Sequence, residues 1–180
     1  MSIEQVVSHQ PIVQTDRLTL RPLQQADLGL IEHYASDDRV ARMTPAIPHP
    51  LPPGMMEAFV SRAMQMERDE DVWAMDGTVQ GGPDLMGLIS LHRMDREQSE
   101  ISYWVAPAFW NTGLASDAVA ALVEANPMIN VTMFASVFQD NPASARVLTN
   151  CGFKYIGDAE TFCVARNAPV PTWTYLRKLG

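Results

Sequence analysis

Short runs of alternating polar and apolar residues recur along the chain. The first covers residues 17–23 and ends near Pro22; it predicts a strand, because neighbouring side chains of a strand point to opposite faces. Residues 76–82 contain turn-forming Asp and Gly, so the runs on either side are expected to pair as antiparallel strands. In all, we predict strands at residues 17–23, 72–75, 85–92, 100–105, 131–138, 153–156 and 172–179.

Other segments repeat their apolar residues at helical spacing. Asp27 is expected to cap one helix, and Asn141 to cap another that ends before Gly152. Residues 44–54 contain five prolines and therefore predict a loop. We predict one helix that starts after Asp27, and further helices at residues 37–43, 55–68, 113–125 and 142–150. This order of helices and strands predicts a single α/β (α+β) domain built on one sheet.

Composition places the chain among ordinary globular domains. Its 180 residues suit one domain, and a hydrophobic content of 47% is enough for a sizeable core. The formal net charge of −8 argues against nucleic acid as a partner, although backbone N–H groups can still bind a small anion. Cys151 and Cys163 form no disulfide framework, and the four histidines are too far apart for a local metal motif. No signal peptide or membrane-spanning run is recognisable, so we expect a cytoplasmic protein with no bound metal and no membrane contact.

Residues 100–123 predict a strand, a turn and a helix, and the turn is suited to bind an anion. Gly113 and Ala115 are small, so N–H groups at the start of the helix can face outward with no side chain in the way. A helix N-terminus favours a nearby anion by about 0.3–1 kcal/mol, and a pyrophosphate would fit there. An ordinary strand-to-helix connection is the alternative, and neither a P-loop nor a dinucleotide-binding glycine motif is present.

A second segment begins at Asn141 and Pro142 and contains Ser144. By itself it predicts a capped helix, with Asn141 as N-cap and Pro142 at the first helical position. Asn141 and Ser144 are three residues apart and can face the same side of the first turn, so they could also bond the amides or the sulfur of a cofactor. The residues alone leave both interpretations open.

Four segments carry a family resemblance: residues 15–22 read T-D-R-L-T-L-R-P, residues 100–107 read E-I-S-Y-W-V-A-P, residues 110–118 read W-N-T-G-L-A-S-D-A, and residues 141–153 read N-P-A-S-A-R-V-L-T-N-C-G-F. In this order they resemble the GNAT superfamily of acyl-CoA-dependent N-acetyltransferases, and more closely its ribosomal-protein-alanine (RimJ/RimL-like) branch. The resemblance extends over residues 12–179. It implies one N-acetyltransferase domain, with residues 1–14 as a flexible lead-in.

The resemblance implies a mixed, mostly antiparallel sheet of about seven strands flanked by helices. In the family the fourth and fifth strands splay apart, and the pantetheine arm of acetyl-CoA lies in the gap. A primary amine attacks the thioester directly, so the implied function is N-acetylation. The implied cofactor-binding residues are Trp104, Val105 and Ala106 for the pantetheine, Asn111, Thr112, Gly113, Leu114, Ala115 and Ser116 for the pyrophosphate, and Asn141 and Ser144 near the thioester; Trp110, which opens the turn, is also among them.

The implied catalytic residues depart from the family pattern. Leu148 stands where many relatives have a tyrosine that protonates the departing thiolate. Ser144 is the best local replacement, because a hydroxyl can donate to sulfur, or it could simply cap the helix or bond pantetheine. Glu100 matches the family's fourth-strand carboxylate and could take the amine proton through water, or it could be a structural partner. Asp158 and Glu160 are further candidates for this base.

No motif identifies the acceptor. A protein N-terminus, a free amino acid, a polyamine and other small amines are all open, and the loop at residues 44–54 is expected to shape their entrance. The absent tyrosine favours an α-amine, whose pKa of about 8 leaves more of it neutral than a lysine with a pKa of about 10.4. The same absence supports a rival interpretation, a non-catalytic acyl-CoA-binding module. Monomer and homodimer are both open.

Overall fold

One eight-stranded sheet runs through residues 10–179, the part of the chain that this computed structural model describes. The strands lie in the order β1-β2-β3-β4-β5-β6-β8-β7, and every neighbouring pair is antiparallel except β5 and β6. They are β1 (Val13–Gln14), β2 (Thr19–Pro22), β3 (Glu70–Asp76), β4 (Gly87–Met94), β5 (Gln98–Val105), β6 (Thr132–Phe138), β7 (Lys154–Cys163) and β8 (Ala168–Lys178). The predicted mixed, mostly antiparallel sheet is confirmed. β1 is an additional strand at the end of the predicted lead-in, of which residues 1–9 lie outside the described part.

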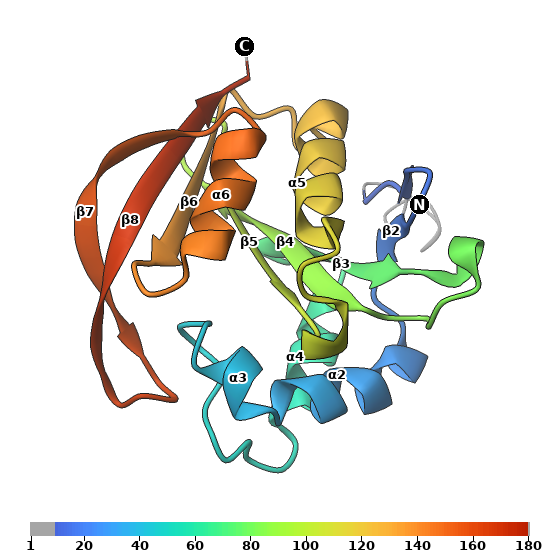
Figure 1. The fold of residues 1–180 in the computed structure, drawn as a ribbon. Helices are drawn as coiled ribbons and strands as arrows, with labels where there is room; N and C mark the ends of the chain where they lie inside the picture. Colours follow the sequence, from blue (N-terminus) through green and yellow to red (C-terminus); the bar gives the residue numbers. More distant parts are fainter. Residues whose placement is uncertain (1–9, 180) are drawn as a thin grey trace.

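Helices cover both faces of the sheet (Figure 1). They are α2 (Leu28–Ala35), α3 (Asp38–Ala41), α4 (Met55–Ala63), α5 (Leu114–Ala125) and α6 (Pro142–Asn150), with short 3-10 helices η1 (Gln25–Asp27), η2 (Thr78–Gln80) and η3 (Pro107–Phe109). α5 and α6 share one hydrophobic core with one face of the sheet, and α2, α3 and α4 share a second core with the other face. α5 buries Leu114, Ala118 and Leu122, whose spacing of four residues puts them on one side of the helix. No helix within residues 10–179 is long and apolar enough to cross a membrane.

One predicted helix cap and one predicted helix bound need correction, although α2 does start directly after Asp27 as predicted. Asp27 does not cap α2 with its side chain; it ends η1, where its carboxylate accepts the Gln24 N–H at 2.8 Å and pairs with Arg21 at 2.8 Å. The predicted helix at residues 55–68 ends at Ala63. Beyond it the chain turns, and Arg68 donates to backbone carbonyls of that turn instead of continuing the helix.

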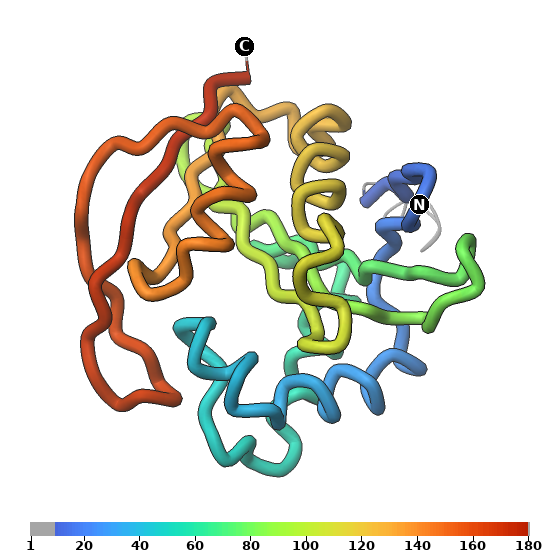
Figure 2. The backbone as a smooth tube through the Cα atoms, in the orientation of Figure 1, coloured from blue at the N-terminus to red at the C-terminus, as the bar shows by residue number. Residues whose placement is uncertain are grey.

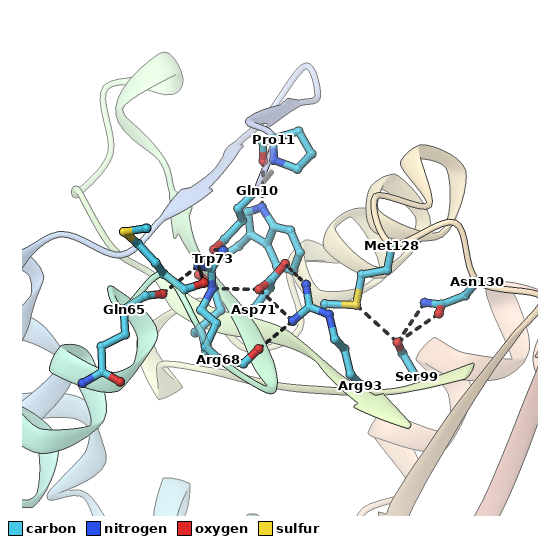
Figure 3. A network of polar contacts seen from close by, with 12 residues as sticks. Gln10, Pro11, Gln65, Arg68, Asp71, Trp73, Arg93, Ser99, Met128 and Asn130 are labelled. Atoms are coloured by element: carbon cyan, nitrogen blue, oxygen red, sulfur yellow. Dashed lines mark hydrogen bonds and ion pairs between the residues drawn. The ribbon is translucent and has the colours of Figure 1, made fainter. Parts of the chain in front are cut away.

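A polar network ties the beginning of the described chain to the sheet (Figure 3). Asp71 is 1% exposed, and guanidinium nitrogens of Arg68 and Arg93 lie 2.8 and 3.3 Å from its carboxylate oxygens. Arg68 also donates to the Gln10 side chain at 3.1 Å, and Gln10 donates to a β3 carbonyl at 2.7 Å. A buried carboxylate needs such partners, because an unpaired interior charge is costly. The network therefore fixes the start of β3, where Glu70 precedes Asp71.

β5 and β6 run parallel and pair over only three residues before they part. Their ladder begins at Gln98↔Thr132 and ends at Glu100↔Phe134, whereas both strands continue beyond it. β6 remains paired with β8 to its end, so the strands separate on the β5 side. The splay predicted between the fourth and fifth predicted strands is present as this gap, which Figure 2 shows between β5 and β6.

The backbone groups at the gap belong to alternate residues of β5. In a ladder, successive residues direct their N–H and C=O groups to opposite neighbours. The N–H of Val131 bonds to the carbonyl of Glu97 at 2.7 Å, which shows that odd-numbered residues face β6. The N–H and C=O groups of Tyr103 and Val105, beyond the end of the ladder, therefore face the gap.

Candidate active site

The gap joins a cavity of about 960 Å³, within the range of small-molecule sites. On the α5–α6 face it is bounded by the turn before α5 and the first turn of α6, and on the other face by α4, residues 39–47 and the strands β3 to β5. The predicted site residues that line it are Glu100, Trp104, Val105, Trp110, Asn111, Thr112, Gly113, Leu114, Ala115, Ser116, Asn141 and Ser144. The structure thus brings together two segments that are far apart in sequence, residues 100–116 and residues 141–144.

The turn before α5 presents backbone N–H groups to this cavity. Asn111 and Gly113 have φ angles of 62° and 77°, a left-handed conformation that glycine adopts without strain and asparagine tolerates. The N–H of Asp117 bonds to Gly113 O, so the N–H groups of Leu114, Ala115 and Ser116 precede the first hydrogen bond within the helix. Together with the positive end of the α5 dipole, these groups suit an anion.

Arg17 anchors the same turn from the other end of the chain. Its guanidinium donates to the Thr112 carbonyl at 2.8 Å and pairs with Asp117 at 2.5 Å. A Cβ on Gly113 would lie 3.3 Å from this guanidinium, which adds a steric reason for glycine to the conformational one. The sequence placed Arg17 in a motif but did not show this contact, because the two segments are 95 residues apart.

Only part of the predicted pantetheine-binding edge faces the gap. Ala106 does not line the cavity: it is fully buried, and its N–H donates to Met86 O at 2.8 Å. Trp104 lies two residues before Ala106, so its backbone N–H and C=O groups also face β4, although its side chain lines the cavity. Val105 faces the gap as predicted, but its carbonyl accepts the Trp110 indole N–H at 2.7 Å. Of the predicted residues, the N–H of Val105 is thus the backbone group left directed into the gap, next to the N–H and C=O of Tyr103.

The first turn of α6 forms the wall opposite this edge. Asn141 is its N-cap, as predicted, and its side chain accepts the Ser144 N–H at 3.4 Å. The Ser144 hydroxyl donates to the Tyr103 hydroxyl at 2.9 Å, and the Tyr103 hydroxyl donates to the Ser144 carbonyl at 3.1 Å. Burial raises the pKa of Tyr103 well above its usual value, so this tyrosine stays protonated. The sequence did not point to Tyr103, because its partner on α6 is 41 residues away.

Three other positions considered for catalysis supply no acid or base to the cavity. Leu148 has no proton to donate, and its side chain is fully buried in the core between α6 and the sheet. Asp158 and Glu160 are exposed on β7, do not line the cavity, and are therefore wrong as candidate bases there. Asp158 instead accepts a hydrogen bond from the Tyr155 hydroxyl. Within residues 10–179, no group of three or more His, Cys, Asp or Glu is arranged to hold a metal ion.

Glu100 and a second carboxylate, Glu70, line the half of the cavity next to α4. Strand register places Glu70, His92 and Glu100 in one row across β3, β4 and β5, with their side chains on the same face. Desolvation raises the pKa of Glu100 above its ordinary range; nearby His92 opposes this shift and Glu70 adds to it. Ser90 donates to the Glu70 carboxylate at 3.0 Å. Sequence reasoning missed Glu70, because only the register brings it beside Glu100.

Comparisons with known proteins agree with this architecture. Residues 17–154 match the family described as acetyltransferase (GNAT) domain. Over 174 residues the chain is 28% identical to the uncharacterized N-acetyltransferase YoaA of Bacillus subtilis (strain 168), covering 92% of this chain and 95% of that protein.

Two solved structures share the fold at low sequence identity. Spermidine N-acetyltransferase from Vibrio cholerae, in complex with CoA and spermine, has a TM-score of 0.76 at 17% identity, covering 92% of this chain and 97% of that chain. Mycobacterium smegmatis RimJ, in complex with CoA-disulfide, has a TM-score of 0.75 at 17% identity, covering 94% and 88%. Because the family match covers well over half of the chain, this protein is an acetyltransferase that belongs to the GNAT domain family.

Proposed function

We propose that this protein transfers an acetyl group from acetyl-CoA to a primary amine. The observation that carries the proposal is one cavity that joins the β5–β6 gap, the turn before α5 and Glu100. The gap offers an open strand edge, the turn offers N–H groups for phosphate, and Glu100 offers a carboxylate for an amine. Relatives of the same fold solved with CoA support the choice of cofactor.

The chain's own groups fit such a cofactor at three places. The turn from Asn111 to Ser116 would hold the pyrophosphate, because its N–H groups lie ahead of the first hydrogen bond of α5, whereas the Trp110 N–H already donates to Pro107 O at 3.2 Å. The N–H of Val105 would pair with the pantetheine arm, and Asn141 and Ser144 would lie near the thioester. Acetyl-CoA would supply the acetyl group as a thioester.

Glu100 would accept a proton from the incoming ammonium. The free amine can form the new C–N bond only after this loss, and a raised pKa makes the Glu100 carboxylate a better base than an ordinary glutamate. As the C–N bond forms the C–S bond breaks; the nitrogen gives up a second proton, and one proton reaches the departing sulfur. An ammonium ion and a thioester thus become an amide, a thiol and one released proton.

Ser144 is the proposed donor of the proton to sulfur, with Tyr103 behind it. Each hydroxyl can both donate and accept, so the short chain between them can run in either direction. When Tyr103 donates to Ser144, the serine hydrogen is free to turn toward the thioester. The remaining acceleration would come from holding amine and thioester in the reacting orientation.

The finer assignment, to the ribosomal-protein-alanine branch, rests on the motif resemblance, with the RimJ fold in support. It would make the α-amine of a protein the acceptor. We also propose a cytoplasmic location, which suits the two free thiols of Cys151 and Cys163.

Release of free thiol from acetyl-CoA in the presence of varied amines tests the proposal. The Glu100→Gln variant is expected to lose about a hundredfold in kcat, within the range for removal of a general base, while its affinity for acetyl-CoA by calorimetry is unchanged. Glu124→Gln, an exposed carboxylate on α5 that does not line the cavity, is the matched control. Binding of acetyl-CoA without thiol release from any amine would favour the non-catalytic module instead.

A further inference from the structure

The α4 side of the cavity has one acidic spot. Among the lining residues, Glu70 and Glu100 are the carboxylates, and the register puts them two strands apart in one row. Their Cα atoms are therefore roughly 10 Å apart, with His92 between them in the row. The Glu70 carboxylate accepts a hydrogen bond from Ser90, which lines the cavity two residues before His92, so an ammonium group between the two carboxylates would lie over Ser90 and not over His92. His92, the middle residue of the row, is exposed and does not line the cavity.

The remainder of this half of the cavity is mainly apolar. Its walls include Met43, Ile47, Met56, Phe59, Val72 and Phe138, contributed by the loop after α3, by α4 and by facing strands. A ligand that fills it gains by removing apolar surface from water. The other charged groups that line the cavity are Arg39 of α3, which pairs with Asp37 at 2.7 Å, Arg62 of α4 and Arg146 of α6.

This distribution of charge favours amines with a single positive charge over diamines and over amino acids. A second ammonium group on the ligand would find no further carboxylate in the lining, and arginines would repel it. A free amino acid carries its carboxylate on the same carbon as the amine, so binding of the amine between Glu70 and Glu100 would bring three carboxylates together. Such like-charge juxtaposition is unfavourable.

Contacts beside the cavity join two segments of the chain, and one of their residues, Pro45, lines the cavity. The N–H of Val164 donates to Pro45 O at 3.0 Å, and Arg166 donates to Arg42 O at 2.8 Å. Arg166 also pairs with Asp140 at 2.6 Å, which fixes its direction. These contacts join the β7–β8 turn to the loop after α3, and Figure 2 shows both segments at the lower edge of the molecule. An extended polypeptide acceptor that entered between these two segments would have to displace the contacts that join them.

We infer that the acceptor is a small primary amine with one positive charge and an apolar body, whose ammonium lies between Glu70 and Glu100. The inference rests on the proposed acetyl transfer, and it replaces the protein α-amine that the branch resemblance implies by a smaller acceptor. Glu70 becomes a specificity residue, which binds the amine without exchanging its proton. The apolar body extends over Val72 toward Phe59.

Two matched pairs of amines test the inference in the thiol-release assay. 2-Phenylethylamine and phenylalanine differ only by the carboxylate next to the amine, and pentylamine and 1,5-diaminopentane differ only by the second ammonium. We expect kcat/KM to be at least about tenfold higher for the first member of each pair, since each unfavourable charge costs at least that factor. A peptide with N-terminal phenylalanine, expected to react more slowly than 2-phenylethylamine, completes the series.

The Glu70→Gln variant tests the placement of the ammonium. It should raise KM for 2-phenylethylamine about tenfold while KM for acetyl-CoA is unchanged, because one of two charges facing the amine is lost. Glu124→Gln, remote from the cavity, should change neither value.

The possible results distinguish failure of this inference from failure of the proposed acetyl transfer. Faster reaction of phenylalanine, 1,5-diaminopentane or the peptide would overturn the inference and leave the acetyl transfer standing. An unchanged KM for 2-phenylethylamine in Glu70→Gln would do the same. Absence of thiol release with every amine, in protein that still binds acetyl-CoA, would instead overturn the proposed function.

Discussion

Replacement of Gly87 by alanine should damage both the fold and the cofactor edge. A Cβ on Gly87 would lie 2.3 Å from the Trp104 carbonyl oxygen and 3.0 Å from the Val105 Cα, whereas ordinary contacts begin at 3.4 Å. Both contacts are with backbone, so no rotamer change relieves them, and β5 must move by about 1 Å. Overpacking of this kind costs about 1–3 kcal/mol, and a clash with backbone belongs at the upper end of that range.

The two effects are measured separately. For a chain of this length, a loss of about 3 kcal/mol lowers Tm by about 6–12 °C in a thermal melt. A shift of Val105 by about 1 Å should also lower kcat/KM for acetyl-CoA roughly ten- to a hundredfold, because the pantetheine-facing N–H moves with it.

Gly29→Ala is the matched control for this substitution. A Cβ at Gly29 meets nothing within 4 Å, and this exposed position in α2 should gain about 0.5–1 kcal/mol. An unchanged Tm and an unchanged kcat/KM for acetyl-CoA in Gly87→Ala would show that the close backbone contacts at Gly87 do not constrain β5.

Three further substitutions test other parts of the site. Tyr103→Phe removes the hydroxyl bonded to Ser144 and should lower kcat about tenfold with acetyl-CoA affinity unchanged; an unchanged kcat contradicts the two-hydroxyl chain. Because the raised pKa of Glu100 favours its neutral form, the stability it contributes at acid pH is lost as pH rises through that pKa. Glu100→Gln should therefore raise Tm at about pH 8 but not at about pH 4, and a pH-independent difference would exclude this reasoning. Thr172 has a buried hydroxyl with no hydrogen-bond partner among the described residues, so Thr172→Val should raise Tm by about 2–4 °C; a lower Tm would show that the hydroxyl is bonded.

Local signals in the sequence predicted the helix at residues 142–150 to the residue. Asn141 as N-cap, Pro142 at the first position and Gly152 after the end are interactions within a few residues, so no tertiary information is needed. The long hairpin of β7 and β8 was predicted only in part. β7 is largely exposed, and prolines at 169 and 171 obscure the pattern of β8, so its length depends on the neighbouring strands that hold it.

The site shows the same division between local and long-range information. The turn at Gly113 was predicted because its chemistry lies in consecutive residues. Ala106 was placed at the cofactor edge wrongly, because the side to which a strand's backbone points is decided by pairing with β4. Glu70 and Tyr103 were missed for a related reason, since their partners lie on elements brought close only by the completed sheet.

The gap between β5 and β6 also has a consequence for solubility. An open strand edge at the margin of a sheet invites pairing with another chain and aggregation. Here the open edge, from Tyr103 to Val105, lies in the middle of the sheet, between β4 and β6. The true margins are protected differently: β1 has only two residues, and β7 carries the charges of Asp158 and Glu160 together with an irregularity in register near Gly157. The fold thus offers free backbone groups to a narrow ligand while keeping them away from the strands of other molecules.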